Sequence, residues 1–172
     1  GIMTEHKLRA DDIERITVGG DRFSLVHGGA IGPRPKSVIE AQFSTHYSLA
    51  MAAVLGANDF STYSAMAAEQ FENAAVCELA QRIEMVLDPD CDARYPDISK
   101  ATVTVVTRRG QKLYGEGYCF RELTADEVRN KFHKIMADSV MPEQAPGIAK
   151  AVADLESIEN VAALARLLVR RK

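Results

Sequence analysis

The 172-residue sequence predicts an α+β fold, in which a small antiparallel or mixed sheet with flanking helices is followed by a helical C-terminal extension. Two observations carry this prediction. Alternating apolar and polar residues, typical of half-buried strands, occur at 13–18 and on both sides of Gly110. Apolar residues at helical spacing fill much of the remaining chain. We therefore expect an α+β domain over 1–122 and a helical extension over 123–172.

The N-terminal part of the chain predicts a pair of strands. "IERITV" (13–18) alternates apolar and polar residues, and "RFSLVH" (22–27) also fits a short strand. The Gly19-Gly20 pair between them predicts a turn. The next segment, 28–35, is rich in glycine and proline and is expected to be a loop.

A helix over 39–55 is predicted from its apolar spacing. Apolar residues recur every four positions and form one stripe, at Ile39, Phe43, Tyr47, Met51 and Leu55. Gly56 follows the last of them and predicts the C-terminal end of the helix.

Polar side chains border this apolar stripe. Gln42, Ser44 and His46 lie among apolar neighbours, and Gln42 and His46 are expected one helical turn apart. Burying a polar group costs free energy unless it finds a hydrogen-bond partner. Two interpretations follow: the polar groups are satisfied inside a helix interface, or they line a ligand-binding cleft. The residues alone favour the first interpretation.

The second half of the chain predicts a helix, a strand and a hairpin. Residues 64–82 have helical periodicity, and the short apolar run at 83–88 fits a strand. Two further strand-like segments, 101–109 and 111–120, flank Gly110 and predict a hairpin that turns at this glycine.

The C-terminal extension is predicted to be helical. Thr124 and Glu127 have the spacing of a capping box and predict a helix start, and two more helical stretches cover 143–157 and 160–169. Their apolar stripe consists of Ile148, Val152, Leu155, Leu164, Leu167 and Leu168. Because an exposed stripe of this kind favours self-association, we expect a homodimer.

Composition excludes several classes of protein. The net charge of −3 provides no attraction for nucleic acid. No apolar run has the length of a membrane span, and the N-terminus has no signal-peptide pattern. The three cysteines, Cys77, Cys91 and Cys119, form no CxxC pair and are typical of free thiols in a reducing compartment. We expect a soluble, cytoplasmic protein with no nucleic-acid or membrane partner.

Two motif-like stretches are better explained by structure than by chemistry. "HGGA" (27–30) has the look of an esterase oxyanion loop, but the chain contains no Gly-x-Ser-x-Gly nucleophile motif. Asp88, Asp90 and Asp92 have the spacing of the first EF-hand ligands, but Ala93 stands at the position that requires glycine. We interpret the second stretch as a solvated turn and expect no metal site.

The segment "GPRPKSVIEAQFSTHYSLAMAAVLG" (32–56) resembles the characteristic segment of the MmgE/PrpD family. That family carries Glu/Asp-Ala-x-x-Ser-x-x-Tyr-x-x-Ala, followed by a cluster of small residues that ends in glycine. The matching positions here are Glu40, Ala41, Ser44, Tyr47, Ala50 and Gly56. Residues 10–18, 76–90, 101–117 and 123–135 are similar to further family segments in the same order, so the resemblance covers nearly the whole chain.

The resemblance implies a function. The family includes 2-methylcitrate dehydratase, cis-aconitate decarboxylase and an iminodisuccinate epimerase, which use no metal or organic cofactor and move protons next to a carboxylate of a small di- or tricarboxylate. Members combine a large helical domain with a smaller α+β lid, and the active site lies in the cleft between the two domains. By this resemblance Tyr47 is the catalytic hydrogen-bond donor or proton carrier. We expect the polar residues that border it, Gln42, Ser44 and His46, to bind the substrate.

The resemblance also sets limits on this function. The family's helical domain, with its acid/base residues, has no counterpart in the chain, and "IMTEHKL" (2–8) reads as the tail of a longer helix. His46 stands where the family pattern has proline or another residue. We therefore expect the C-terminal lid portion of such a lyase or isomerase, inactive alone, whose residues 123–172 pack on the helical domain. The alternative is a non-catalytic, stand-alone binding or assembly module that keeps the lid fold.

Overall fold

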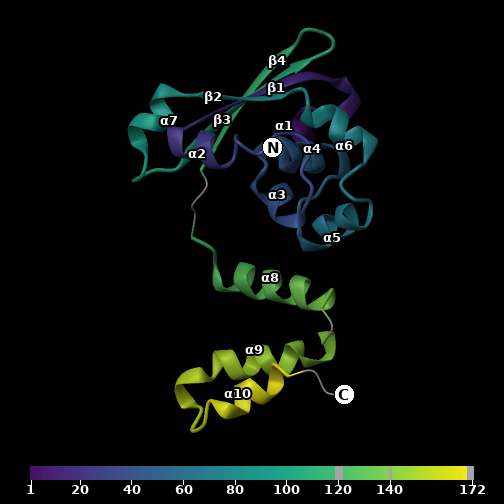
Figure 1. Ribbon diagram of the computed structural model, residues 1–172. Coiled ribbons are helices and arrows are strands. Elements are labelled where there is room, and N and C mark those ends of the chain that lie inside the picture. The colour runs from purple at the N-terminus through teal and green to yellow at the C-terminus, as the bar shows by residue number, and fades with distance from the viewer. Residues whose placement is uncertain (119–121, 140, 170–172) are drawn as a thin grey trace. The chain divides into compact units, whose positions relative to one another are not determined.

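The computed structural model describes residues 1–118, 122–139 and 141–169. The chain forms two compact units, Gly1–Arg121 (unit 1) and Glu122–Lys172 (unit 2). Unit 1 contains a four-stranded mixed sheet with strand order β2-β1-β3-β4, and unit 2 is helical over its described residues (Figure 1). The predicted α+β class is confirmed.

The sheet combines one parallel pair with an antiparallel hairpin. Its strands are β1 (Ile13–Gly20), β2 (Ile83–Leu87), β3 (Lys100–Thr107) and β4 (Lys112–Tyr118). β1 pairs with β2 in parallel, whereas the β1/β3 and β3/β4 pairs are antiparallel. Gly110 has φ 80° in the hairpin turn, so the predicted hairpin is confirmed; residues 119–120 of its second strand lie outside the described residues.

The predicted second strand at 22–27 is wrong, because this segment is helix α2 (Arg22–His27). The carboxylate of Asp21 caps the helix: Oδ1 accepts from the Ser24 amide at 2.8 Å, and Oδ2 accepts from the Ser24 hydroxyl at 2.7 Å. The Gly19-Gly20 pair makes no turn and instead forms the last two residues of β1. A six-residue apolar pattern fits both a strand and a helix. Here the Asp21 cap stabilises the helix.

The predicted continuous helix over 39–55 is also wrong. It is two helices, α3 (Val38–Phe43) and α4 (Thr45–Leu55), separated at Ser44. The backbone of Ser44 is extended, with φ −88° and ψ 107°, and its hydroxyl accepts from the Tyr47 amide at 3.1 Å, so it is the N-cap of α4. The predicted end of α4 is confirmed, since Gly56 adopts φ 74°.

The break at Ser44 splits the predicted apolar stripe. Tyr47 and Met51 are fully buried, whereas Ile39 and Phe43 are 68% and 57% exposed. Leu55 is also exposed. Residues on either side of a helix break no longer share a face, and this explains why only the part of the stripe within α4 reaches the core.

The segment predicted as one helix over 64–82 contains two. These are α5 (Phe60–Ala68) and α6 (Ala74–Ala80), and Asn73 caps the second by accepting from the Val76 amide at 3.2 Å. The strand predicted after them is confirmed as β2.

The aspartate-rich stretch forms a short helix rather than the predicted turn. Helix α7 (Pro89–Arg94) begins at Asp88, whose Oδ1 accepts from the amides of Asp90 and Cys91 at 2.9 and 3.3 Å. Proline is favourable at the first helical position, because an N–H at that position would have no partner within the helix.

Two short elements precede β1: α1 (Ile2–Glu5) and a 3-10 turn (Ala10–Asp12).

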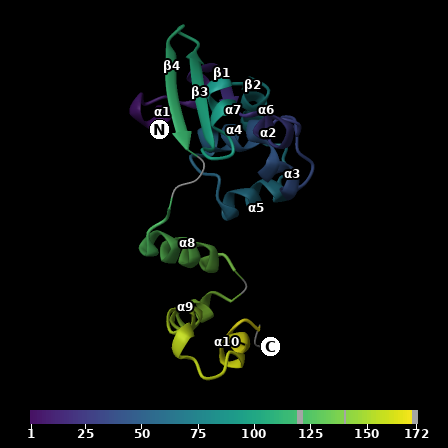
Figure 2. The same ribbon diagram turned by 90° about the vertical axis from the view of Figure 1, so that its left-hand side faces the viewer.

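The core of unit 1 lies between the sheet and helices α3 to α6, which gather on one side of the sheet (Figure 2). Its largest fully enclosed side chains are Tyr47, Ile13, Met51, Leu79 and Val76. They come from both layers, so the packing of α6 on α4 and of α4 on the sheet holds this unit together.

Unit 2 begins with the predicted capping box. The Thr124 amide donates to Glu127 Oε2 at 2.9 Å, and the Glu127 amide donates to Thr124 Oγ1 at 3.3 Å. The helices of this unit are α8 (Ala125–Ala137), α9 (Ala145–Ala153) and α10 (Ala162–Leu167), with 3-10 turns at Pro142–Gln144 and Leu155–Ser157. In both units, no described helix combines the length and apolarity that crossing a membrane requires.

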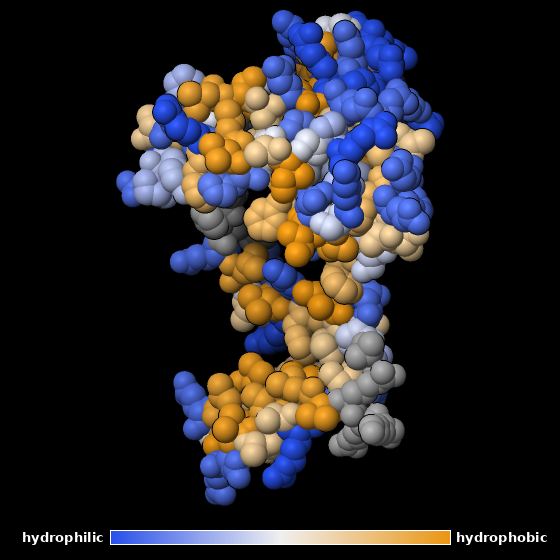
Figure 3. Space-filling view, viewed as in Figure 1, coloured by the Kyte–Doolittle hydropathy of each residue, from blue (hydrophilic) through white to orange (hydrophobic). Residues whose placement is uncertain are grey.

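The surface of unit 2 is rich in apolar side chains (Figure 3). Among its described residues only Ala145 and Ile148 are buried. The exposed large apolar residues are Leu123, Val128, Ile135, Val152, Leu155, Val161, Leu168 and Val169.

Candidate functional site

Tyr47, the predicted catalytic residue, lies in the core of unit 1. Its side chain is fully buried, and its ring meets the ring of Phe71 edge-to-face, with centroids 6.0 Å apart. The hydroxyl of Tyr47 is enclosed and has no hydrogen-bond partner within the described part of the chain. A buried hydroxyl without a partner is uncommon in folded proteins, because its desolvation is left uncompensated.

The environment of Tyr47 keeps its phenol protonated. Burial, together with the nearby Cys77 thiol and the carboxylates of Glu69 and Glu72, raises the pKa of Tyr47 to about 12. At neutral pH the group is therefore a neutral O–H donor. Chemically, it is able to donate a hydrogen bond to an acceptor from outside residues 1–118, within which it has none.

Ser44 fixes the position of Tyr47. Ser44 is fully buried, its hydroxyl donates to the carbonyl of Gly32 at 2.9 Å, and the same oxygen accepts from the Tyr47 amide at 3.1 Å. The serine thereby ties the glycine- and proline-rich loop to the first turn of α4. Its hydroxyl has a donor and an acceptor partner in the resting structure.

The two other predicted site residues lie on different helices. Gln42 is exposed on α3, and His46 is half-buried on α4. The expected placement one turn apart on a single helix is wrong, because the chain breaks at Ser44 between them. Nδ1 of His46 is buried and has no partner within the described residues, so this imidazole, like the Tyr47 phenol, has unused hydrogen-bonding capacity.

A second buried tyrosine, which the sequence did not reveal, contrasts with Tyr47. The hydroxyl of Tyr63 on α5 lies 2.8 Å from Oγ of Ser48, and that serine also donates to the carbonyl of Ala41 at 3.1 Å. Helices α3, α4 and α5 are joined by this chain of hydrogen bonds. Tyr63 is thus a satisfied structural tyrosine. The contact spans fifteen positions along the chain, and no local pattern in the sequence indicates it.

The conformation of the turn between α5 and α6 is also not predicted by the sequence. Gln70 and Phe71 adopt φ 52° and 60° in succession, in the left-handed region that residues other than glycine and asparagine rarely occupy. Such a conformation costs about 1–3 kcal/mol per residue and persists only where surrounding contacts hold it. No glycine or asparagine occupies either position, so the sequence carries no signal for it.

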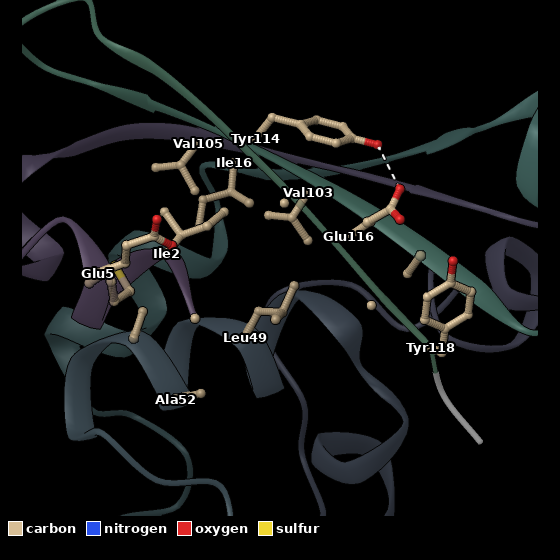
Figure 4. A pocket seen from close by; sticks show the side chains of 16 residues that line it. Ile2, Glu5, Ile16, Leu49, Ala52, Val103, Val105, Tyr114, Glu116 and Tyr118 are labelled. Carbon is tan, nitrogen blue, oxygen red and sulfur yellow. Dashed lines mark hydrogen bonds between the residues drawn. The ribbon is translucent and has the colours of Figure 1, made fainter. Parts of the chain in front are cut away.

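A separate cavity of about 660 Å³ lies between the sheet, α1 and α4 (Figure 4). Its apolar walls include Ile2, Leu49, Ala52, Val103 and Val105. Leu49 and Ala52 lie on the face of α4 opposite Tyr47, because successive helical residues are rotated by 100°. The cavity and Tyr47 are therefore distinct features of the same helix.

The polar groups of this cavity do not suit a carboxylate ligand. Among its described lining residues, none has a basic side chain, whereas Glu5 and Glu116 both line it. Tyr114 donates to Glu116 at 3.5 Å (Figure 4). Lys100 Nζ lies 2.9 Å from the same carboxylate. The hydrogen bond from Lys100 lowers the pKa of Glu116, so this carboxylate stays ionised and already paired.

The aspartates that resemble EF-hand ligands have other partners. Asp88 caps α7 and accepts from the Thr102 hydroxyl at 2.9 Å, and Asp90 pairs with Arg94 and Lys100 at 2.9 and 3.1 Å. Within residues 1–118, 122–139 and 141–169, no group of three or more histidine, cysteine, aspartate or glutamate side chains is arranged to hold a metal ion.

The four-stranded sheet with its flanking helices defines a small α+β domain, and unit 2 adds a separate helical unit to it. A family model described as "MmgE/PrpD C-terminal domain" matches residues 1–157. The chain belongs to the MmgE/PrpD family and corresponds to the C-terminal portion of its members, as the resemblance predicted. No curated protein matches the chain. Helix α10 lies beyond the matched residues.

Proposed function

We propose that this domain supplies Tyr47 to the active site of an MmgE/PrpD-type lyase or isomerase. The substrate is a small di- or tricarboxylate, and the reaction moves a proton next to a carboxylate, as in dehydration, decarboxylation or epimerisation. The observation that supports this proposal most strongly is the buried Tyr47 hydroxyl, which is a protonated donor with no acceptor among the described residues. Family membership places this domain in a dehydratase-like family.

The proposed chemistry requires a neutral donor of this kind. Proton abstraction beside a carboxylate produces an enolate-like species, and a preorganised hydrogen-bond donor in a water-poor site stabilises its negative charge. Because burial raises the pKa of Tyr47 to about 12, the phenol keeps its proton throughout the neutral range. An ionised tyrosine would repel the same species.

The other proposed residues differ in how directly they reach a substrate. Gln42 is exposed, and the buried Nδ1 of His46 has no partner among the described residues, so we propose that both bind carboxylate or hydroxyl groups of the substrate. Ser44 contributes by holding the first turn of α4, and hence Tyr47, in place. We propose no metal or organic cofactor for this reaction.

The proposal also includes a second protein surface. We propose that the acid/base residues come from a helical domain and that the apolar side chains of unit 2 pack on that domain, with a homodimer as the assembled form. The 172 residues alone are then inactive. The alternative is a non-catalytic binding or assembly module, which needs no route from solvent to the enclosed Tyr47 hydroxyl.

The test is a pair of tyrosine variants in an enzyme that joins this domain to the family's helical domain. Tyr47→Phe should lower kcat by at least about a hundredfold, the usual scale for the loss of one preorganised donor. Tyr63→Phe is the matched control, since it removes a buried hydroxyl that is bonded to Ser48, and should leave kcat unchanged. Equal kcat values for Tyr47→Phe and the parent enzyme would refute the catalytic role and favour the assembly module.

A further inference from the structure

The turn at Glu69–Glu72 (the 69–72 turn) joins α5 to α6 in an energetically unfavourable conformation. Gln70 and Phe71 have consecutive positive φ values of 52° and 60°. Steric contact between Cβ and the backbone disfavours this region for L-residues, and a bulky aromatic residue there is unusual. Such outliers cluster at sites where a segment is held by its surroundings or moves during function.

Contacts of Phe71 hold the turn in place. Its amide donates to the Met66 carbonyl at 2.8 Å, and its own carbonyl accepts from the thiol of Cys77 at 3.2 Å. Its ring is buried and lies edge-on to the ring of Tyr47 at 6.0 Å. The strained conformation is therefore coupled directly to the position of Tyr47.

We infer that the 69–72 turn is a movable cover over the Tyr47 hydroxyl and that Phe71 is the positioning residue that closes it. The inference rests on the proposed function, in which a substrate must reach a hydroxyl that is enclosed in the resting structure. The 69–72 turn differs from the other neighbours in its backbone: α4 is held at Ser44 by two hydrogen bonds and Tyr63 is bonded to Ser48, and Tyr47, Ser44 and Tyr63 do not have the positive φ values of Gln70 and Phe71. The turn is the neighbour of Tyr47 with an unfavourable backbone conformation. When the turn is displaced, its residues leave that conformation, and this lowers the free energy that opening costs.

The charges of the turn support the same inference. Glu69 and Glu72 are exposed, and their charges act on the Tyr47 phenol. In the closed form these carboxylates oppose the approach of an anionic substrate. Displacement of the turn carries both charges away together with Phe71. One motion thus uncovers the donor and removes the repulsion.

The buried cysteines offer a direct test in the full chain. Cys77 donates to Phe71, whereas Cys91 is buried in α7, and burial raises the pKa of both thiols. Iodoacetamide labelling of both thiols is followed in one sample by peptide mass spectrometry. A local opening of the turn should label Cys77 at least about tenfold faster than Cys91 and with little dependence on low urea concentrations.

A glycine variant sharpens the test. Gln70→Gly removes strain from the closed form, because glycine adopts φ 52° without a steric penalty. It should slow Cys77 labelling severalfold and leave Cys91 labelling no faster. Equal labelling rates for the two thiols, with the same urea dependence, would show that the turn opens only by global unfolding and would overturn the inference.

Kinetics separate this inference from the proposed function. In the two-domain enzyme, Gln70→Gly should raise KM severalfold with little change in kcat, because a smaller fraction of the protein is open to substrate. If Tyr47→Phe lowers kcat while Gln70→Gly changes neither KM nor thiol labelling, the cover is refuted and the catalytic role stands. If Tyr47→Phe keeps full turnover, the catalytic role fails, and with it the purpose of the cover.

Discussion

Unit 1 encloses a core of large apolar side chains, whereas unit 2 leaves most of its large apolar side chains exposed. In unit 1 a sheet and helices α3 to α6 enclose a continuous core in which Tyr47, Ile13, Met51 and Leu79 are inaccessible to solvent. In unit 2 the described helices bury only Ala145 and Ile148 and expose most of their large apolar side chains. The contrast is one of packing rather than of composition.

The two units differ in which contacts supply their favourable free energy of folding. Removal of apolar surface from water is the main favourable contribution to folding, and unit 1 obtains it within its own residues. Unit 2 leaves that contribution available for another surface, as elements that pack against a further domain or chain do. We therefore expect unit 1 to carry the cooperative unfolding transition of the chain.

The largest expected effect is that of a core truncation in unit 1. Leu79→Ala, at a fully buried position of α6, should lower the free energy of unfolding by about 2–5 kcal/mol. The matched change in unit 2, Leu155→Ala, should alter it by less than about 0.5 kcal/mol, because Leu155 is 48% exposed. Urea denaturation monitored by circular dichroism measures both. Similar losses for the two variants would contradict the contrast between the units.

The helix caps provide a second matched pair. Ser44→Ala removes both the cap of α4 and the bond to the Gly32 carbonyl, and should cost about 2 kcal/mol. Thr124→Ala removes the cap of α8 and should leave the main transition unchanged while lowering the helical signal of unit 2. A shift of the main melting temperature by Thr124→Ala as large as that by Ser44→Ala would show that the two units unfold together.

Replacement of Asp21 should lower the free energy of unfolding by less than the changes above, and by an amount that depends on pH. Burial alone would raise the pKa of Asp21, but hydrogen bonds from the Ser24 amide and hydroxyl outweigh it, and the net pKa is lowered from its ordinary value of 3.8. A lowered carboxylate pKa stabilises the fold above the unfolded-state value and loses this contribution as the pH falls through the folded-state value. Asp21→Asn should therefore cost about 1.5 kcal/mol at neutral pH.

Acid titration provides the check on Asp21. The stability difference between the parent chain and Asp21→Asn should shrink as the pH falls below 3.8. The exposed Asp11→Asn is the control and should follow the parent chain throughout. A difference that stays constant down to acid unfolding would show that the effect of Asp21 is steric rather than electrostatic.

The sequence predicts the strands of this fold better than its helix boundaries. Period-2 alternation in the sequence identifies the strand at 13–18 and the hairpin around Gly110. Helical spacing at 39–55 predicts one helix, yet the Ser44 cap divides it, since a serine hydroxyl competes for backbone amides. The apolar spacing at 22–27 fits both a strand and a helix, and only the Asp21 cap distinguishes the two.

The candidate site is predictable only in part, for a physical reason. Tyr47 and Ser44 stand out through a family resemblance, and the structure joins them by a hydrogen bond. The strained Gln70-Phe71 pair and the Ser48–Tyr63 bond are set by packing between separate helices. Such tertiary contacts leave no trace in local spacing, so no sequence pattern predicts them.

Tyr47 holds a hydrogen-bond donor inside the core of unit 1, and this donor has no partner within the described residues. The most direct test compares the free energies of unfolding of Tyr47→Phe and Tyr63→Phe in this chain. Tyr63→Phe should lose about 1 kcal/mol, because it leaves Ser48 without its hydroxyl partner. Tyr47→Phe should be as stable as the parent chain or more stable, since it removes a buried hydroxyl that has no partner. An equal loss in both variants would show that the Tyr47 hydroxyl is bonded within the fold and would contradict the account.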